Sequence, residues 1–176
     1  SGSRTYLATR ILYNLGNKYY QGRGVDQSFR RAGRWYRMAA ELNLAAGKPE
    51  EFENLEDSLF FSVLVGKVEL VQDLIQLGTE LNCRDNKGRT PLIYSILANQ
   101  QEIARRLVKG GAELELVDDT GHTALHWAVM LGERRLVDFL LAQGADKSRT
   151  TEGGRTARQL AEQYNQLRIL TLIEFN

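Results

Sequence analysis

The fold is decided by a stretch of sequence that occurs twice, as DNKGRTPLIYSILA at residues 85–98 and as DDTGHTALHWAVML at residues 118–131. The two copies start 118 − 85 = 33 residues apart, and the same step aligns six columns of glycine, threonine and aliphatic residues. These columns are Gly88/Gly121/Gly154, Gly78/Gly111/Gly144, Thr90/Thr123/Thr156, Leu74/Leu107/Leu140/Ile173, Leu70/Ile103/Leu136/Ile169 and Leu59/Leu92/Leu125, the last of which is broken at Arg158. Self-similarity at such a period is the signature of a stack of repeated units.

Each unit predicts a projecting turn followed by two short helices. The turn at residues 85–88 is followed by Thr90-Pro91, where threonine suits the N-cap of a helix and proline suits its first turn. We expect this helix to run to about residue 98, a polar break at Asn99, and a second helix that ends at Gly110-Gly111. The recurring glycines fit left-handed positions that residues with a Cβ adopt poorly.

These residues resemble the ankyrin-repeat family. The resemblance rests on residues 86–92 (NKGRTPL), 120–128 (TGHTALHWA) and 140–146 (LLAQGAD), which follow the family's T-P-L-H-x-A pattern and its repeat ending. It implies an all-α helical repeat solenoid with four repeats that start near residues 57, 85, 118 and 151. The first repeat lacks the turn signature, and the fourth is similar to a capping repeat, as suits the ends of an array.

Residues 8–46 do not follow this period and are similar to a single Sel-one-like repeat, a relative of the tetratricopeptide helix hairpin. Residues 1–44 hold eight basic and two acidic side chains, a net of +6, although the whole chain has a net charge of only +1. We therefore expect three parts: a Sel-one-like hairpin at 1–46, a packed junction at 47–56, and the ankyrin repeats at 57–176.

Residues suited to catalysis or metal binding are few. His122 and His126 lie four apart, a spacing that can place both on one helix face, but a metal would need a third ligand. The resemblance instead gives His126 a structural role, because the family uses this imidazole to tie neighbouring turns together. Asp118-Asp119 sit on a solvated turn, and Cys83 is the only cysteine. We expect no enzyme, no cofactor and no metal.

The resemblance implies that the chain binds a partner protein through its turn tips and inner helices, without catalysis. The aromatic column Phe61, Tyr94 and Trp127 could contribute to this surface or to packing between repeats, and the sequence leaves both open. The positions that correspond to the family's binding surface are Phe61, Asn86, Lys87, Arg89, Tyr94, Leu97, Asp119, Thr120, His122, Trp127, Met130, Leu131, Thr151, Glu152 and Arg155. A bacterial toxin-neutralising immunity protein, a secreted effector and an assembly adaptor could all use such a scaffold.

The alternative is a protein that binds an anion, either nucleic acid or acidic lipid, through one helix face that carries Arg30, Arg31, Arg34 and Arg37. We consider nucleic acid an improbable partner, because we expect no aromatic side chain interleaved with these arginines to point outward for base stacking. No apolar run approaches the length of a membrane span. We expect a soluble chain, monomeric by itself, and either cytoplasmic or, if a signal peptide was removed, periplasmic or secreted.

Overall fold

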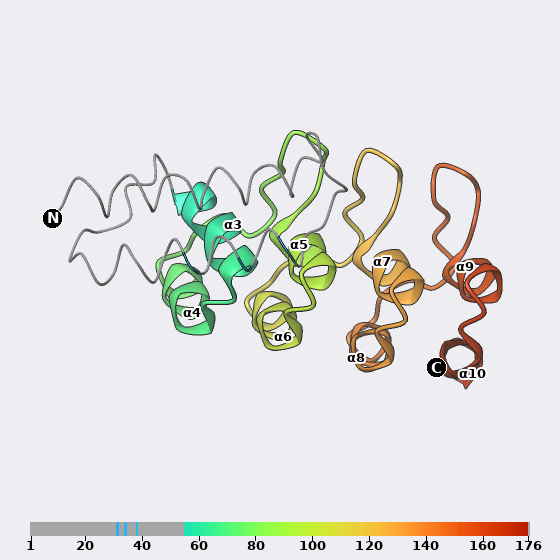
Figure 1. Ribbon diagram of the computed structural model, residues 1–176. Helices are drawn as coiled ribbons and strands as arrows, with labels where there is room; N and C mark the ends of the chain where they lie inside the picture. Colours follow the sequence, from blue (N-terminus) through green and yellow to red (C-terminus); the bar gives the residue numbers. More distant parts are fainter. Residues whose placement is uncertain (1–30, 32–33, 35–37, 39–54, 176) are drawn as a thin grey trace, which may run out of the picture. The chain divides into compact units, whose positions relative to one another are not determined.

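The computed structural model describes residues 55–175, apart from the side chains of residues 55–58 and 61, together with Arg31, Arg34 and Met38 (Figure 1). The chain divides into two compact units, Ser1–Thr79 and Glu80–Asn176. In the first unit, α3 (Leu55–Val65) packs against α4 (Val68–Gln76). The buried Leu59, Val63, Val71 and Leu74 form the described part of its core.

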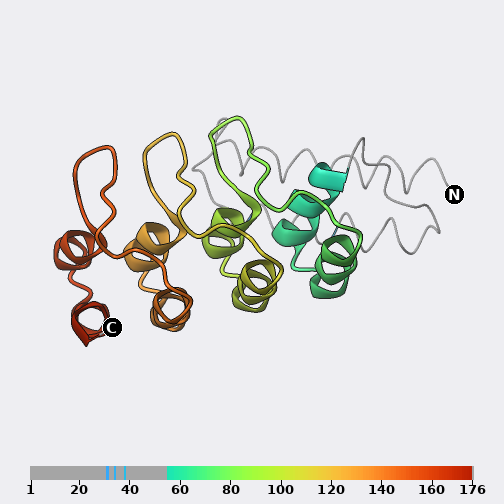
Figure 2. The ribbon, with the colours of Figure 1, turned by 180° about the vertical axis from the view of Figure 1, so that it is seen from behind.

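The second unit consists of three repeats of one helix pair, and Figures 1 and 2 show its helices in two rows. The inner row holds α5 (Pro91–Leu97), α7 (Ala124–Met130) and α9 (Ala157–Gln163). The outer row holds α6 (Gln101–Lys109), α8 (Arg134–Ala142) and α10 (Leu167–Phe175). Each inner helix packs on its own outer helix and on the next inner helix. The all-α repeat architecture is therefore confirmed over these residues.

Each inner helix begins at a threonine N-cap. The Oγ1 atoms of Thr90, Thr123 and Thr156 accept a hydrogen bond from the backbone N–H three residues later, at 3.3, 3.3 and 3.4 Å. This bond satisfies one of the N–H groups that a helix N-terminus leaves open, as the sequence predicted. The aliphatic columns fill the core between the rows, and Ile103, Leu107, Leu136 and Leu140 are fully buried.

A further column, missed in the sequence, follows α3 and each of the three inner helices. Gly66, Asn99, Gly132 and Asn165 repeat at the same 33-residue step and all have positive φ, between 55° and 74°. The backbone N–H of the next residue then bonds back to Ser62, Ser95, Ala128 or Ala161 at 2.7–2.9 Å, as in a Schellman motif. The repeating αL residue thus reverses the chain into each outer helix.

The fourth repeat differs from its neighbours on the helix face where they bury leucine. Leu92 and Leu125 are buried, but Arg158 in the same column is exposed and forms ion pairs with Glu162 and Glu174, both at 3.1 Å. The fourth repeat therefore carries a charged, ion-paired side chain at the register where its neighbours bury leucine.

Candidate functional site

Three projecting turns precede the inner helices of the second unit, and we name them finger A (residues 80–90), finger B (113–123) and finger C (146–156). In finger A, Asp85 Oδ1 accepts hydrogen bonds from the backbone N–H groups of Lys87 (2.9 Å) and Arg89 (2.7 Å). In finger B, Asp118 Oδ1 accepts in the same way from Thr120 (2.9 Å) and His122 (3.1 Å). The Asp85 and Asp118 side chains thus stabilise the backbone conformation of these two turns.

The aromatic column is tied to the same aspartates. Tyr94 Oη donates to Asp85 Oδ2 at 2.9 Å, and Trp127 Nε1 donates to Asp118 Oδ2 at 2.8 Å. Burial alone would raise the pKa of Asp118, but the hydrogen bonds from Thr120, His122 and Trp127 outweigh it and hold that pKa below its usual value. Asp118 is therefore an ionised carboxylate that anchors both a finger and an aromatic ring.

The two aromatic rings differ in how much surface they leave open. Tyr94 is only 3% exposed, and its burial raises the pKa of its hydroxyl. Trp127 is half-buried, and the His122 ring lies over it with 5.1 Å between ring centroids. The side chain of Phe61 lies outside the described residues. Tyr94 thus serves packing, whereas Trp127 also contributes to the surface.

Neighbouring fingers are joined by hydrogen bonds. The backbone N–H of Asp119 donates to Lys87 O at 3.0 Å, and that of Glu152 donates to Thr120 O at 3.4 Å. His126 Nδ1 accepts from the backbone N–H of Thr123 (3.1 Å), so its Nε2 carries the proton and donates to Arg149 O (3.0 Å). This bond confirms that His126 ties neighbouring turns, and burial lowers its pKa.

The histidine pair is not arranged for a metal ion. The two rings lie 6.0 Å apart in an edge orientation, and both nitrogens of His126 are already hydrogen-bonded. Within the described part of the chain, no group of three or more His, Cys, Asp or Glu residues could hold a metal.

The positions that the family resemblance assigned to binding fall into three classes of exposure. Arg89, Tyr94 and Thr151 are buried and offer little surface. The exposed positions are Asn86, Asp119, Thr120, Leu131, Glu152 and Arg155, and the half-buried ones are Lys87, Leu97, His122, Trp127 and Met130.

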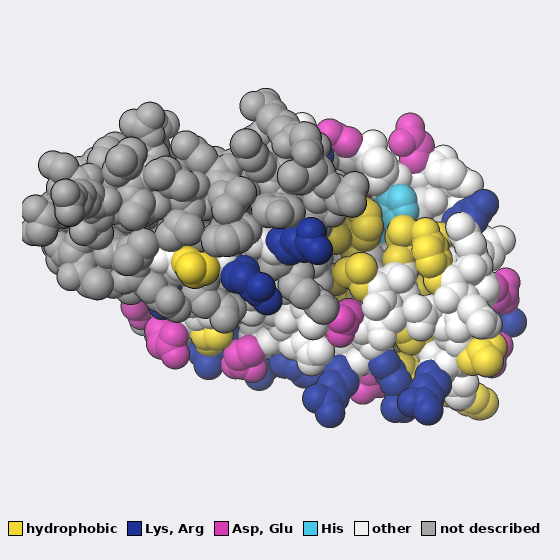
Figure 3. All heavy atoms as spheres, in the orientation of Figure 1, with side chains coloured by type: hydrophobic (Ala, Val, Ile, Leu, Met, Phe, Trp, Pro, Cys, Tyr) yellow, Lys and Arg dark blue, Asp and Glu magenta, His cyan; other side chains and the backbone are white. Residues whose placement is uncertain are grey.

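The exposed and half-buried positions lie on the fingers and on the inner helix row. Figure 3 shows hydrophobic side chains beside a histidine on this face, below acidic fingertips. Tyr164, which was not among the predicted positions, is 42% exposed and lies 33 residues after Leu131, itself 47% exposed. The repeat register alone would have found it.

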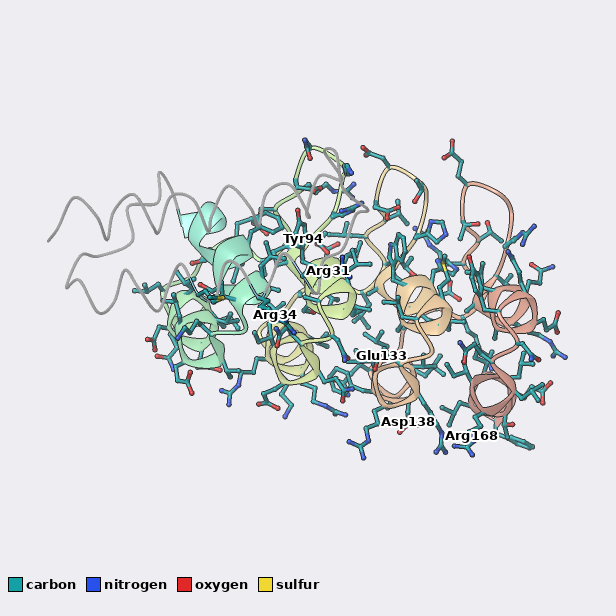
Figure 4. The ribbon with its side chains drawn as sticks, in the orientation of Figure 1. Arg31, Arg34, Tyr94, Glu133, Asp138 and Arg168 are labelled. Atoms are coloured by element: carbon teal, nitrogen blue, oxygen red, sulfur yellow. The ribbon has the colours of Figure 1, made fainter. Side chains whose placement is uncertain are left out.

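Figure 4 shows the buried Tyr94 between α5 and finger A.

The alternative basic site falls mostly on residues whose structure is not described. Arg31 and Arg34 are helical and exposed, whereas Arg30 and Arg37 lie outside the described residues. The Sel-one-like repeat and most of the junction lie there too, so both stay predictions.

Comparison with known families agrees with this geometry. The sequence model described as "Ankyrin repeats (3 copies)" matches residues 59–151, more than half of the chain. The chain belongs to the ankyrin-repeat family. Ankyrin repeats typically form non-enzymatic scaffolds for protein–protein interaction, so the family indicates a protein partner. No curated protein matches the chain significantly. None of the described helices is long and apolar enough to cross a membrane.

Proposed function

We propose that this ankyrin-repeat chain is a non-enzymatic scaffold that binds one partner protein through its fingertips and inner helix row. The observation that carries the proposal is a set of partly exposed apolar side chains on α7 and at the C-caps of α7 and α9. It consists of Trp127, Met130, Leu131 and Tyr164, and we name it the inner apolar patch. Aromatic and methionine side chains that remain partly open are enriched where proteins bind one another.

The framework beneath the patch supports this role. A hydrogen bond between fingers B and C, from Glu152 to Thr120, and one between α7 and finger C, from His126 to Arg149, fix these fingers relative to the helices before any partner arrives. A preorganised surface loses less conformational freedom on binding than a flexible one does. Asp119, Thr120, Glu152 and Arg155 provide a polar rim.

Affinity capture from a lysate of the source organism tests the proposal. Met130→Glu/Leu131→Glu puts two charges on the patch, and Leu77→Glu is the control, because Leu77 is 70% exposed at the end of α4. We expect the wild type and the control to retain the same protein and the double variant to lose it. Retention by all three would contradict the proposal.

Within this class, the roles of toxin-neutralising immunity protein, secreted effector and assembly adaptor stay open as proposals, and the identity of the captured protein decides among them. We also propose that the chain is monomeric without its partner. The ion pairs of Arg158 on the end face support this, since charged faces stack poorly.

Anion binding through Arg30, Arg31, Arg34 and Arg37 is the competing proposal, favoured by the exposure of Arg31 and Arg34, each of which has helical backbone conformation. Binding through these arginines would weaken steeply with salt, because it releases counterions. Binding through the inner apolar patch would change little. A salt titration of the captured complex separates the two.

A further inference from the structure

Three large apolar side chains of the second unit are exposed where inner helices turn into outer helices. Leu131 is the C-cap of α7, Tyr164 is the C-cap of α9, and Leu167 is the first residue of α10; their exposed fractions are 47%, 42% and 68%. The two turns touch, because a Cβ built at Gly132 would lie 2.8 Å from the side-chain Nε2 of Gln166. Leu131 precedes Gly132 and Leu167 follows Gln166, so the two leucines flank this contact. The inner apolar patch therefore continues across the turns to Leu167.

Arginines occupy the first turns of α8 and α10, directly after these exposed side chains. α8 begins with Arg134 and Arg135, and Arg168 is the second residue of α10; all three are exposed. None of them forms an ion pair with a residue that the structure describes, and neither helix has an acidic residue in its first turn. Figure 3 shows lysine and arginine side chains gathered along the lower edge, below the hydrophobic ones, and Figure 4 shows Arg168 at this edge beside α10.

The repeat register shows that two of these arginines take the place of glutamates. Glu69, Glu102, Arg135 and Arg168 follow one another at 33-residue steps and are the second residues of α4, α6, α8 and α10. The helix dipole favours an acidic side chain in the first turn and disfavours a basic one. Helix stability therefore does not account for Arg135 and Arg168, and residues that break a local rule in this way are expected at functional sites.

The two carboxylates that flank the arginines of α8 in the sequence do not neutralise them. Glu133 accepts a hydrogen bond from Gln101 Nε2 at 3.3 Å and, in the hydrogen-bonded orientation of the Asn99 amide, another from Asn99 Nδ2 at 3.0 Å. Its charge thus faces the preceding repeat. Asp138 lies one turn further along α8. Positive charge therefore borders the exposed leucines on the side of the outer helices.

We propose that the segment of the partner protein that covers these turns is both apolar and acidic. Its apolar side chains would contact Leu131, Tyr164 and Leu167, and its aspartate or glutamate side chains would pair with the arginines of α8 and α10. The inference rests on the proposed function and names the chemistry of its partner. Arginine suits this role because its guanidinium can donate two parallel hydrogen bonds to one carboxylate. Complementary charge beside an apolar contact selects the partner, and a basic segment would be repelled.

A phage library of random peptides, selected on the purified chain, tests this chemistry. We expect the retained peptides to hold about twice the share of aspartate and glutamate that the unselected library holds, or more, because exposed ion pairs are individually weak but several act together here. Arg135→Glu/Arg168→Glu gives the last two repeats the glutamate that the first two carry at this register. This variant should abolish the enrichment.

Two controls separate binding from other effects of charge. Arg135→Glu/Arg168→Glu should melt at the wild-type temperature or above it, because glutamate suits the first turn of a helix. Arg30→Glu/Arg34→Glu reverses the same number of charges at the competing anion site and should leave the enrichment intact.

Retained peptides no more acidic than the library would overturn the inference, and so would a selection that retains no peptide. An enrichment that survives Arg135→Glu/Arg168→Glu, or that disappears in Arg30→Glu/Arg34→Glu, would refute it as well. A lower melting temperature of Arg135→Glu/Arg168→Glu would show that these arginines stabilise the fold and would also overturn it.

Lysate capture is independent of this result. If Met130→Glu/Leu131→Glu loses the captured partner while the peptides show no acidic enrichment, the proposed function stands and only the acidic chemistry of the partner is refuted.

Discussion

The close approach of fingers B and C at Gly121 predicts an unusually costly substitution. Gly121 has a φ of +74°, and a Cβ built there would lie 2.4 Å from the backbone nitrogen of Glu152 and 3.1 Å from the carbonyl carbon of Thr151. Both contacts are to backbone, so no flexible side chain can move aside. Gly121→Ala must therefore displace finger C and strain the 3.4 Å hydrogen bond from Glu152 to Thr120.

The expected loss in free energy of unfolding has two parts. An alanine at positive φ costs about 1 kcal/mol or slightly more in free energy of unfolding. Overpacking against a neighbour that must shift adds about 1–3 kcal/mol. We therefore expect Gly121→Ala to lower the free energy of unfolding by about 2–4 kcal/mol in a urea titration followed by circular dichroism.

Gly154→Ala is a matched control within the same chain. Its φ is +72°, but no heavy atom of the described residues lies within 4 Å of the added Cβ. Only the cost of the positive φ remains, about 1 kcal/mol. Losses of stability that agree within about 0.5 kcal/mol would refute the reasoning, because ordinary surface substitutions already vary by that much. The contact between fingers B and C would then add no cost to Gly121→Ala.

Three further predictions concern charge and titration. The pKa of His126 is lowered in the folded chain, so the unfolded chain takes up its proton first and stability should fall as the pH drops below about 6.5. His126→Gln, which matches Gln159 of the fourth repeat, should make thermal melting less pH-dependent between about pH 7 and 5, and an unchanged slope would count against the buried imidazole. Arg158→Leu removes the ion pairs on the end face and should cause concentration-dependent association in light scattering; a monomer at all concentrations would contradict the capping role. A chelator should leave the melting temperature unchanged, because both His126 nitrogens are hydrogen-bonded, and a clear shift would restore the metal hypothesis.

The sequence predicted the repeat fold well because its signals are local. A threonine caps the helix that follows it, and a glycine takes a positive φ, whatever the distant residues are. The chain reversal at Asn99 and Asn165 was missed because asparagine alternates with glycine in this column. Asparagine is a weaker predictor of a positive φ than glycine is. The polar break at Asn99 was seen, but not its αL conformation.

The candidate surface was harder to predict, because exposure depends on neighbours. Tyr94 and Trp127 occupy one register, yet Tyr94 is buried and Trp127 is partly open. Arg89 and Thr151 resemble open finger positions in the sequence but are buried in the structure. The orientation of the His122 ring depends on its hydrogen bond with Thr120 and its contact with the Trp127 ring, and no spacing rule gives these distances.

The most direct test of the central claim is the affinity of the purified chain for its captured partner, measured by calorimetry. The inner apolar patch should dominate binding, so Met130→Glu/Leu131→Glu should weaken the affinity more than about tenfold, as for interface hot spots. Leu77→Glu, which adds charge at the exposed leucine directly after α4, should bind as the wild type does. Equal affinity of all three proteins would show that the partner binds elsewhere on the chain.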